Sequence, residues 1–276
     1  MAGAQKPVGD RCCIFCTAMA FAAWLTNPCW RAWPASSTGG SVTRKGMATA
    51  TTVACFAVGT APLRWPSRPS KAGGASMAKY PVALGHSFGG VLTSLMLAAE
   101  PQLFQRAVLL DPVLFSKRML AVLGAARVVG LHRQHPMARQ AARRRSFWPD
   151  RPSAHASLQG RGIFKGWHDA ALQAYIDHAL GECEKGVVLK CRPSREVEIF
   201  SSFPRRLWPT LLRIAVPTRI LYGEHTYPFV PVSANRLASL NSHVSARQVA
   251  GGHCFMQEKP GNAADLATGL LLGTGP

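Results

Sequence analysis

Acidic side chains are scarce in this chain of 276 residues, where 13 Asp and Glu stand against 32 Lys and Arg and the formal net charge is +19 at pH 7. Such an excess raises the question of nucleic-acid binding. The basic residues are scattered, and the tightest group, Arg143 to Arg145 beside Arg139, is typical of a solvated helix face that attracts anionic substrates. No zinc-finger spacing, RNA-binding aromatic motif or helix-turn-helix pattern accompanies them, so we expect no specific nucleic-acid partner.

Other common signals are also missing. Neither a P-loop nor a G-x-G-x-x-G motif occurs, and no cofactor is expected. Cys12-Cys13-x-x-Cys16 has no matching pair of Cys or His residues, which argues against a metal site. No run of 18 apolar residues is present, so no transmembrane helix is expected.

The most informative motif present is Gly85-His86-Ser87-Phe88-Gly89-Gly90. It follows the apolar run Pro81–Leu84, which predicts a buried strand, and precedes Val91–Ala99, which predicts a helix. A G-x-S-x-G pentad between a strand and a helix is the setting of a nucleophile elbow, in which Ser87 adopts strained backbone angles and its hydroxyl is exposed. The same residues could instead form a Gly-rich turn that only packs a helix against a sheet.

Three later segments extend the pattern. Leu109-Leu110-Asp111-Pro112 ends a second predicted strand, Leu221-Tyr222-Gly223 lies in a third, and Gly251-Gly252-His253 precedes a final helix. Together with the elbow they resemble the α/β-hydrolase fold family from about Tyr80 to the C-terminus. The resemblance implies a mostly parallel sheet with helices on both faces, an inserted helical cap, and hydrolysis of an ester or related acyl bond of a small-molecule substrate. Carbon–carbon bond hydrolysis stays open, as does an inactive relative; the sequence does not indicate an oligomeric state.

The resemblance also assigns roles. Ser87 is the expected nucleophile, His253 its base, and the Phe88 N–H an oxyanion donor. The usual position of the acid, three residues after Gly223, is occupied by Thr226. Two carboxylates could replace it, Asp111 after the second strand and Glu224 on the usual loop, and we favour Asp111.

The predicted domain organisation has four parts: an atypical segment at 1–75, hydrolase core at 76–113, a helical cap at 114–208, and core again at 209–276. In the cap, Leu172, Tyr175, Ile176 and Leu180 recur at helical spacing and predict a helix with one buried face. Cap aromatic residues could line the substrate pocket or form the core of the cap. The expected substrate-contacting residues are His86, from the elbow, with Phe147, Trp148 and Trp167.

The first 75 residues differ from the rest, since they hold five of the eight Cys, four of the seven Trp and a single acid, Asp10. The family's His-Gly oxyanion motif belongs here, yet the sequence contains no His-Gly pair. One interpretation is a secretory signal within residues 1–35, which predicts a secreted protein; without it a cytoplasmic location is expected.

A shifted reading frame is the other interpretation. Read from the third base of each codon, residues 15–21 permit Leu-His-Gly-Asn-Gly-Phe and residues 45–50 permit Arg-x-Gly-His-Gly, and both strings resemble loops of the family. An out-of-frame segment loses the apolar pattern of buried strands. On this interpretation we expect residues 1–75 to be mostly irregular and the sheet edge beside Pro81–Leu84 to be unpaired.

Overall fold

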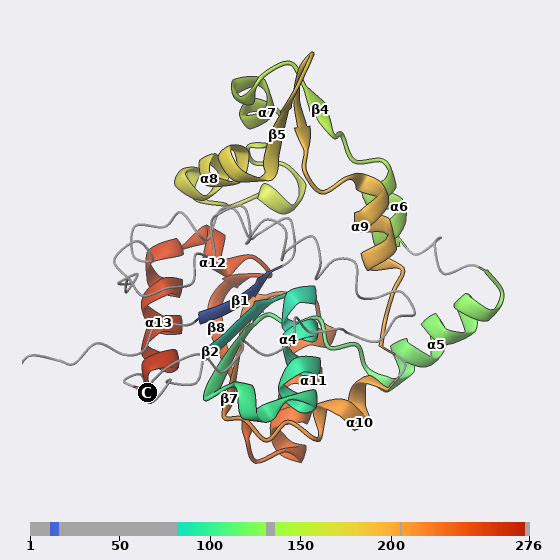
Figure 1. Ribbon diagram of the computed structural model, residues 1–276, viewed down its shortest axis with the longest axis vertical. Coiled ribbons are helices and arrows are strands. Elements are labelled where there is room, and N and C mark those ends of the chain that lie inside the picture. Colours follow the sequence, from blue (N-terminus) through green and yellow to red (C-terminus); the bar gives the residue numbers. More distant parts are fainter. Residues whose placement is uncertain (1–11, 17–81, 131–135, 205, 274–276) are drawn as a thin grey trace, which may run out of the picture.

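A computed structural model describes residues 12–16, 82–130, 136–204 and 206–273, and its centre is a five-stranded parallel sheet in the order β1-β2-β3-β7-β8 (Figure 1). The strands are β1 (Cys12–Cys16), β2 (Val82–His86), β3 (Arg106–Leu110), β7 (Thr218–His225) and β8 (Val244–Gly252). The predicted strands correspond to β2, β3 and β7. β8 was not predicted, and Gly251 and Gly252, which precede His253, are the last two residues of this strand.

Helices cover both faces of the sheet (Figure 1). They are α4 (Phe88–Ala99), α10 (Leu207–Leu211) and α11 (Phe229–Leu240) on one face, and α12 (Phe255–Glu258) and α13 (Pro260–Leu272) on the other. The helix expected over Val91–Ala99 is α4, which begins three residues earlier. A short 3₁₀ helix, η1 (Pro101–Leu103), connects α4 to β3.

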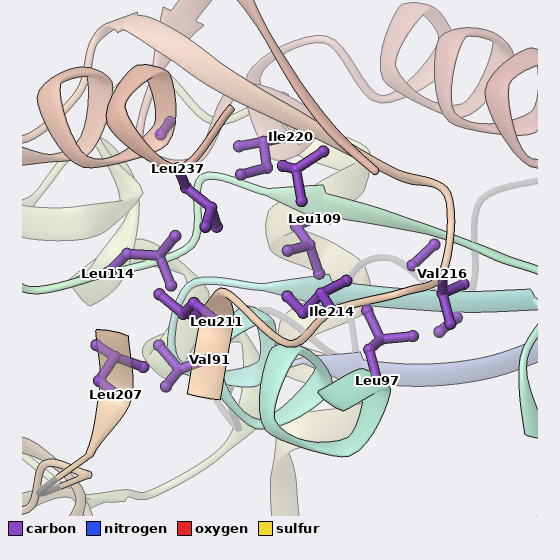
Figure 2. Packing of buried hydrophobic residues seen from close by; sticks show 14 of the residues in the cluster. Val91, Leu97, Leu109, Leu114, Leu207, Leu211, Ile214, Val216, Ile220 and Leu237 are labelled. Carbon is purple, nitrogen blue, oxygen red and sulfur yellow. The ribbon is translucent and has the colours of Figure 1, made fainter. Parts of the chain in front are cut away.

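Alternate side chains of each central strand pack on opposite faces, as the pleat of a strand requires. Leu109 and Ile220 lie with Val91 and Leu97 in the cluster beneath α4, α10 and α11 (Figure 2). Their neighbours Val108, Leu110 and Leu221 join the cluster beneath α12 and α13. Burial on both faces explains why these strands are continuous apolar runs in the sequence.

Most of the segment between β3 and α10 lies over one end of the sheet, whereas its first helix lies beside the sheet (Figure 1). Its helices are α5 (Lys117–Val128), α6 (Pro136–Ala142), α7 (Arg151–Leu158), η3 (Gly162–Phe164), α8 (Asp169–Ala179) and α9 (Pro193–Phe200). It also contains an unexpected three-stranded antiparallel sheet of β4 (Phe147–Trp148), β6 (Gly186–Leu189) and β5 (Leu180–Cys183). The predicted amphipathic helix is α8, but Leu180, which was assigned to the same helix, is the first residue of β5. The apolar face of α8 joins a separate hydrophobic cluster, here called the cap core, which includes Trp148, Phe164 and Tyr175. The domain boundaries at 76, 114 and 209 stay a prediction.

The sequence analysis predicted an unpaired sheet edge beside Pro81–Leu84, the segment that forms β2. This prediction is wrong, because Cys12–Cys16 forms a strand along that edge. β1 pairs in parallel with the whole of β2, from Cys12 opposite Val82 to Cys16 opposite His86. The two interpretations of the first 75 residues, a secretory signal and a shifted frame, otherwise concern residues outside the described part of the chain.

We expect Leu109→Ala to lower the free energy of unfolding by roughly 2–5 kcal/mol, because it leaves a cavity between the sheet and α4. Leu109 is fully buried, whereas Leu240, at the end of α11, is 54% exposed. Leu240→Ala is therefore the matched control and should cost less than about 1 kcal/mol. Urea denaturation of both variants checks this, and equal losses would contradict the packing described above.

Candidate active site

Ser87 lies in a sharp turn between β2 and α4, with a φ of 55° and a ψ of −121°. A positive φ at a residue with a Cβ is strained, by about 1–3 kcal/mol, so the strained turn expected at Ser87 is present. The turn is held by the Ser87 N–H, which donates to the Leu110 carbonyl at 3.0 Å. It also depends on close packing, since a Cβ on Gly90 would lie 2.8 Å from the Cβ of Pro112.

His253 follows β8 directly and extends its ring toward the elbow. Its Nε2 lies 2.9 Å from the Ser87 Oγ, and its Nδ1 lies 2.5 Å from the Asp111 Oδ2. A carboxylate can only accept, so Nδ1 carries the proton and Nε2 is free to accept from the serine hydroxyl. Three residues that are far apart in the sequence therefore form one chain of hydrogen bonds.

Asp111 is completely buried at the end of β3 and has a φ of 46°. Its Oδ1 accepts from the Gly223 N–H at 2.8 Å, and its Oδ2 accepts from the Thr226 hydroxyl as well as from His253. These donors compensate for the burial of a carboxylate. Glu224, the alternative acid, is exposed to solvent, and its carboxylate forms no hydrogen bond or ion pair with a side chain or backbone group in the described part of the chain.

At Gly223, whose N–H donates to Asp111, β7 also approaches β8 closely. A Cβ on Gly223 would lie 2.7 Å from the Gly251 carbonyl oxygen, so a larger residue would push the strands apart. Sequence reasoning identified Thr226 only as the place where an acid was missing. A hydroxyl at that position could have been interpreted as a donor to a carboxylate on a neighbouring strand.

His86 supports the backbone at His253 rather than facing solvent. Its Nε2 lies 3.0 Å from the His253 carbonyl oxygen, so it donates as a neutral imidazole, and the two rings are 4.9 Å apart. Burial, followed by the nearby His253, lowers the pKa of His86 to about 3. His86 therefore remains uncharged at neutral pH and adds no positive charge beside Ser87.

A cavity of about 1070 Å³ lies between Ser87 and the cap. His86 and Trp167, two of the four expected substrate-contacting residues, border it. Phe147 and Trp148 do not: Phe147 is 41% exposed on the outer surface, and Trp148 is fully buried in the cap core with its indole N–H on the Ser157 hydroxyl. The three-stranded cap sheet, absent from the sequence prediction, carries both residues away from the cavity.

Two residues that sequence reasoning missed border the same space. The Tyr227 ring lies 4.8 Å from the His253 ring and stacks on Phe229. Cys254 is a nucleophile by type, but burial raises the pKa of its thiol to about 12, so it stays protonated and unreactive. Ser87 is therefore the nucleophile that the geometry favours.

No cluster of three His, Cys, Asp or Glu side chains within the described ranges is placed to bind a metal ion. In the same part of the chain, no helix has both the length and the apolar character that crossing a bilayer requires.

We expect the free energy of unfolding to fall as the pH drops from about 6.5 toward 3, with His86 contributing up to ~1.4 kcal/mol per pH unit. Over this range the unfolded chain binds a proton at His86 and the folded chain does not, so protonation favours unfolding. His86→Gln keeps an N–H donor but does not titrate, and its stability should depend less on pH. His243→Gln, at an exposed histidine, is the control. Parallel stability curves for His86→Gln and the wild type would contradict the assignment.

Comparison with known proteins places the fold. No family model matches the chain, and no curated protein sequence matches it. Solved structures do. E-2-(acetamidomethylene)succinate hydrolase is 15% identical with a TM-score of 0.61, and a hypothetical protein from Pseudomonas aeruginosa is 16% identical with a TM-score of 0.55; each comparison covers 97% of this chain and 93% of the other. The thioesterase domain from the curacin biosynthetic pathway is 17% identical with a TM-score of 0.50, over 68% of this chain and 64% of that one. These likenesses show that the chain has the α/β-hydrolase fold.

Proposed function

We propose that the chain is a serine-dependent hydrolase that cleaves an ester or related acyl bond of a small molecule. The observation that carries the proposal is the continuous chain of hydrogen bonds from Asp111 through His253 to Ser87, at the wall of a cavity. Similarity to a hydrolase and to a thioesterase domain supports the same reaction class.

In the proposed first step, the Ser87 Oγ attacks the carbonyl carbon of the substrate while His253 Nε2 takes the hydroxyl proton. The resulting imidazolium is stabilised by the Asp111 carboxylate, which also keeps Nδ1 protonated and the ring oriented. The same proton then passes from Nε2 to the leaving alcohol. An acyl-serine remains, and water, deprotonated by His253, hydrolyses it to release the carboxylate product.

The negative oxygen of the tetrahedral intermediate requires donors. Phe88 is the first residue of α4, and a first-turn N–H has no acceptor within its own helix. We assign this N–H as one oxyanion donor, reinforced by the positive end of the helix dipole. The serine at the elbow disfavours relatives that use aspartate there, such as haloalkane dehalogenases, and leaves carbon–carbon bond hydrolysis as a variant of the same chemistry.

A fluorophosphonate probe should label Ser87 covalently, because His253 activates its hydroxyl. Ser87→Ala should abolish labelling and lower ester turnover by about a millionfold, as the loss of a nucleophile does in comparable enzymes. Mass spectrometry of the labelled peptide and hydrolysis of p-nitrophenyl acetate provide the measurements. Equal hydrolysis by the wild type and Ser87→Ala would reject serine catalysis and favour a non-catalytic relative.

The acid can be tested separately. Asp111→Asn should lower turnover by about four orders of magnitude, since an amide can neither stabilise the imidazolium nor fix the tautomer. Glu224→Gln should have little effect, because Glu224 is exposed and outside the hydrogen-bond chain. Rates for both variants with the same ester decide between the two carboxylates, and the reverse ranking would transfer the role to Glu224.

A further inference from the structure

The cap side of the cavity is rich in cationic side chains. The sheet side presents mostly neutral groups, among them Ser87 and Tyr227, together with the carboxylate of Glu258. The cap side presents basic residues from two places, the end of α6 and the surroundings of η3; these are Arg139, Arg143, Arg144, Arg161 and Lys165. Three of the four arginines in the tightest basic cluster of the sequence, Arg139, Arg143 and Arg144, thus line the cavity that Ser87 also borders.

Arg144 differs from the others because its positive charge is already neutralised by an ion pair with Glu196. It bonds Glu196 and, at 2.5 Å, the Tyr175 hydroxyl, and its side chain is only 15% exposed. Burial lowers its pKa, but Tyr175 and Glu196 outweigh that effect and raise it, so the guanidinium stays charged. The Arg144–Glu196 pair joins α6 to α9 and adds no net charge to the cavity.

The remaining four cationic side chains have no carboxylate partner of this kind among the described residues. Among the described residues none of Arg139, Arg143, Arg161 and Lys165 forms an ion pair. Apart from Glu196, the carboxylate on the cavity wall is Glu258, whose oxygens accept from the Gly252 N–H at 3.1 Å. The lining therefore carries an excess of positive charge.

We propose that the substrate is an acyl compound bearing an anionic group, a carboxylate or a phosphate, which Arg143, Arg161 and their cationic neighbours hold while the acyl carbon lies at Ser87. This proposal rests on the proposed function and adds the substrate class. Arginine matches either anion with two parallel hydrogen bonds. Because the side chains are exposed, each contributes modestly alone, but charges of one sign around a cavity focus their field and raise the local concentration of an anion.

Two esters of the same length, one anionic and one neutral, test whether the cavity prefers a negatively charged substrate. p-Nitrophenyl hydrogen adipate and p-nitrophenyl methyl adipate differ only in the terminal carboxylate, and the corresponding suberates allow for a longer reach. We expect kcat/KM to favour the anionic ester by roughly tenfold or more, and the preference to shrink as ionic strength rises from about 0.01 M to about 0.15 M.

The double variant Arg143→Gln/Arg161→Gln should lose most of this preference, measured as the ratio of kcat/KM for the anionic ester to kcat/KM for the methyl ester. Arg213→Gln, at an exposed arginine outside the cavity lining, is the control and should keep the preference. Ser87-dependent hydrolysis with no preference for the anionic ester would overturn this proposal alone. Turnover that persists in Ser87→Ala would instead reject the proposed function.

Binding without turnover supplies a second test. Calorimetric titration of monomethyl adipate, butyl phosphate and neutral dimethyl adipate into Ser87→Ala should show tighter binding of an anion than of the diester. Whichever of the two anions binds more tightly shows whether the substrate carries a carboxylate or a phosphate. Introducing Arg143→Gln/Arg161→Gln should weaken that binding about tenfold or more. Equal binding of all three compounds, or no effect of the arginine substitutions on binding, would overturn the proposal. This test does not require that the protein hydrolyse either ester.

Discussion

The geometry of the candidate site depends on one buried carboxylate. Asp111 accepts from the backbone of Gly223, from the Thr226 hydroxyl and from His253. A charge in the interior is tolerated only when such donors surround it, and removing one of them leaves the others without their partner. The position of His253, and through it the activation that we propose for Ser87, therefore depends on the contacts of Asp111.

The order of the strands makes this arrangement possible. Ser87, Asp111 and His253 directly follow β2, β3 and β8, and Gly223 lies in β7 between the last two. Parallel strands present their carboxyl ends at one edge of a sheet, about 4.8 Å apart. Side chains that follow neighbouring strands can thus meet across the edge. The close approach of β7 and β8 at Gly223 and Gly251 brings His253 within reach of Asp111.

Features that depend on nearby residues could be predicted from the sequence. The elbow at Ser87 is an example, because the glycines, the apolar strand and the following helix are contiguous. The choice between Asp111 and Glu224 stayed open, since it depends on which strands are neighbours in space. The cap sheet was missed because β4 is two residues long and β5 and β6 four each, too short for a period of two to stand out.

Aromatic identity was also a poor guide to position. Trp148 and Trp167 are the same residue type in the same insertion, yet one is buried in the cap core and the other borders the cavity. Only the packing of the cap separates them. The pairing of β1 with β2 was unexpected for a similar reason, because Cys12–Cys16 is short and lies far from β2 in the sequence.

The hydrogen bond between Asp111 and His253 can be observed directly by proton NMR of protein labelled with ¹⁵N-histidine. A proton held between an imidazole Nδ1 and a carboxylate oxygen 2.5 Å away should resonate well downfield of the backbone amides and be attached to a histidine nitrogen. We predict one such signal at His253, present in Glu224→Gln and absent in Asp111→Asn. A spectrum without it, or one in which it survives Asp111→Asn, would contradict the role assigned to Asp111.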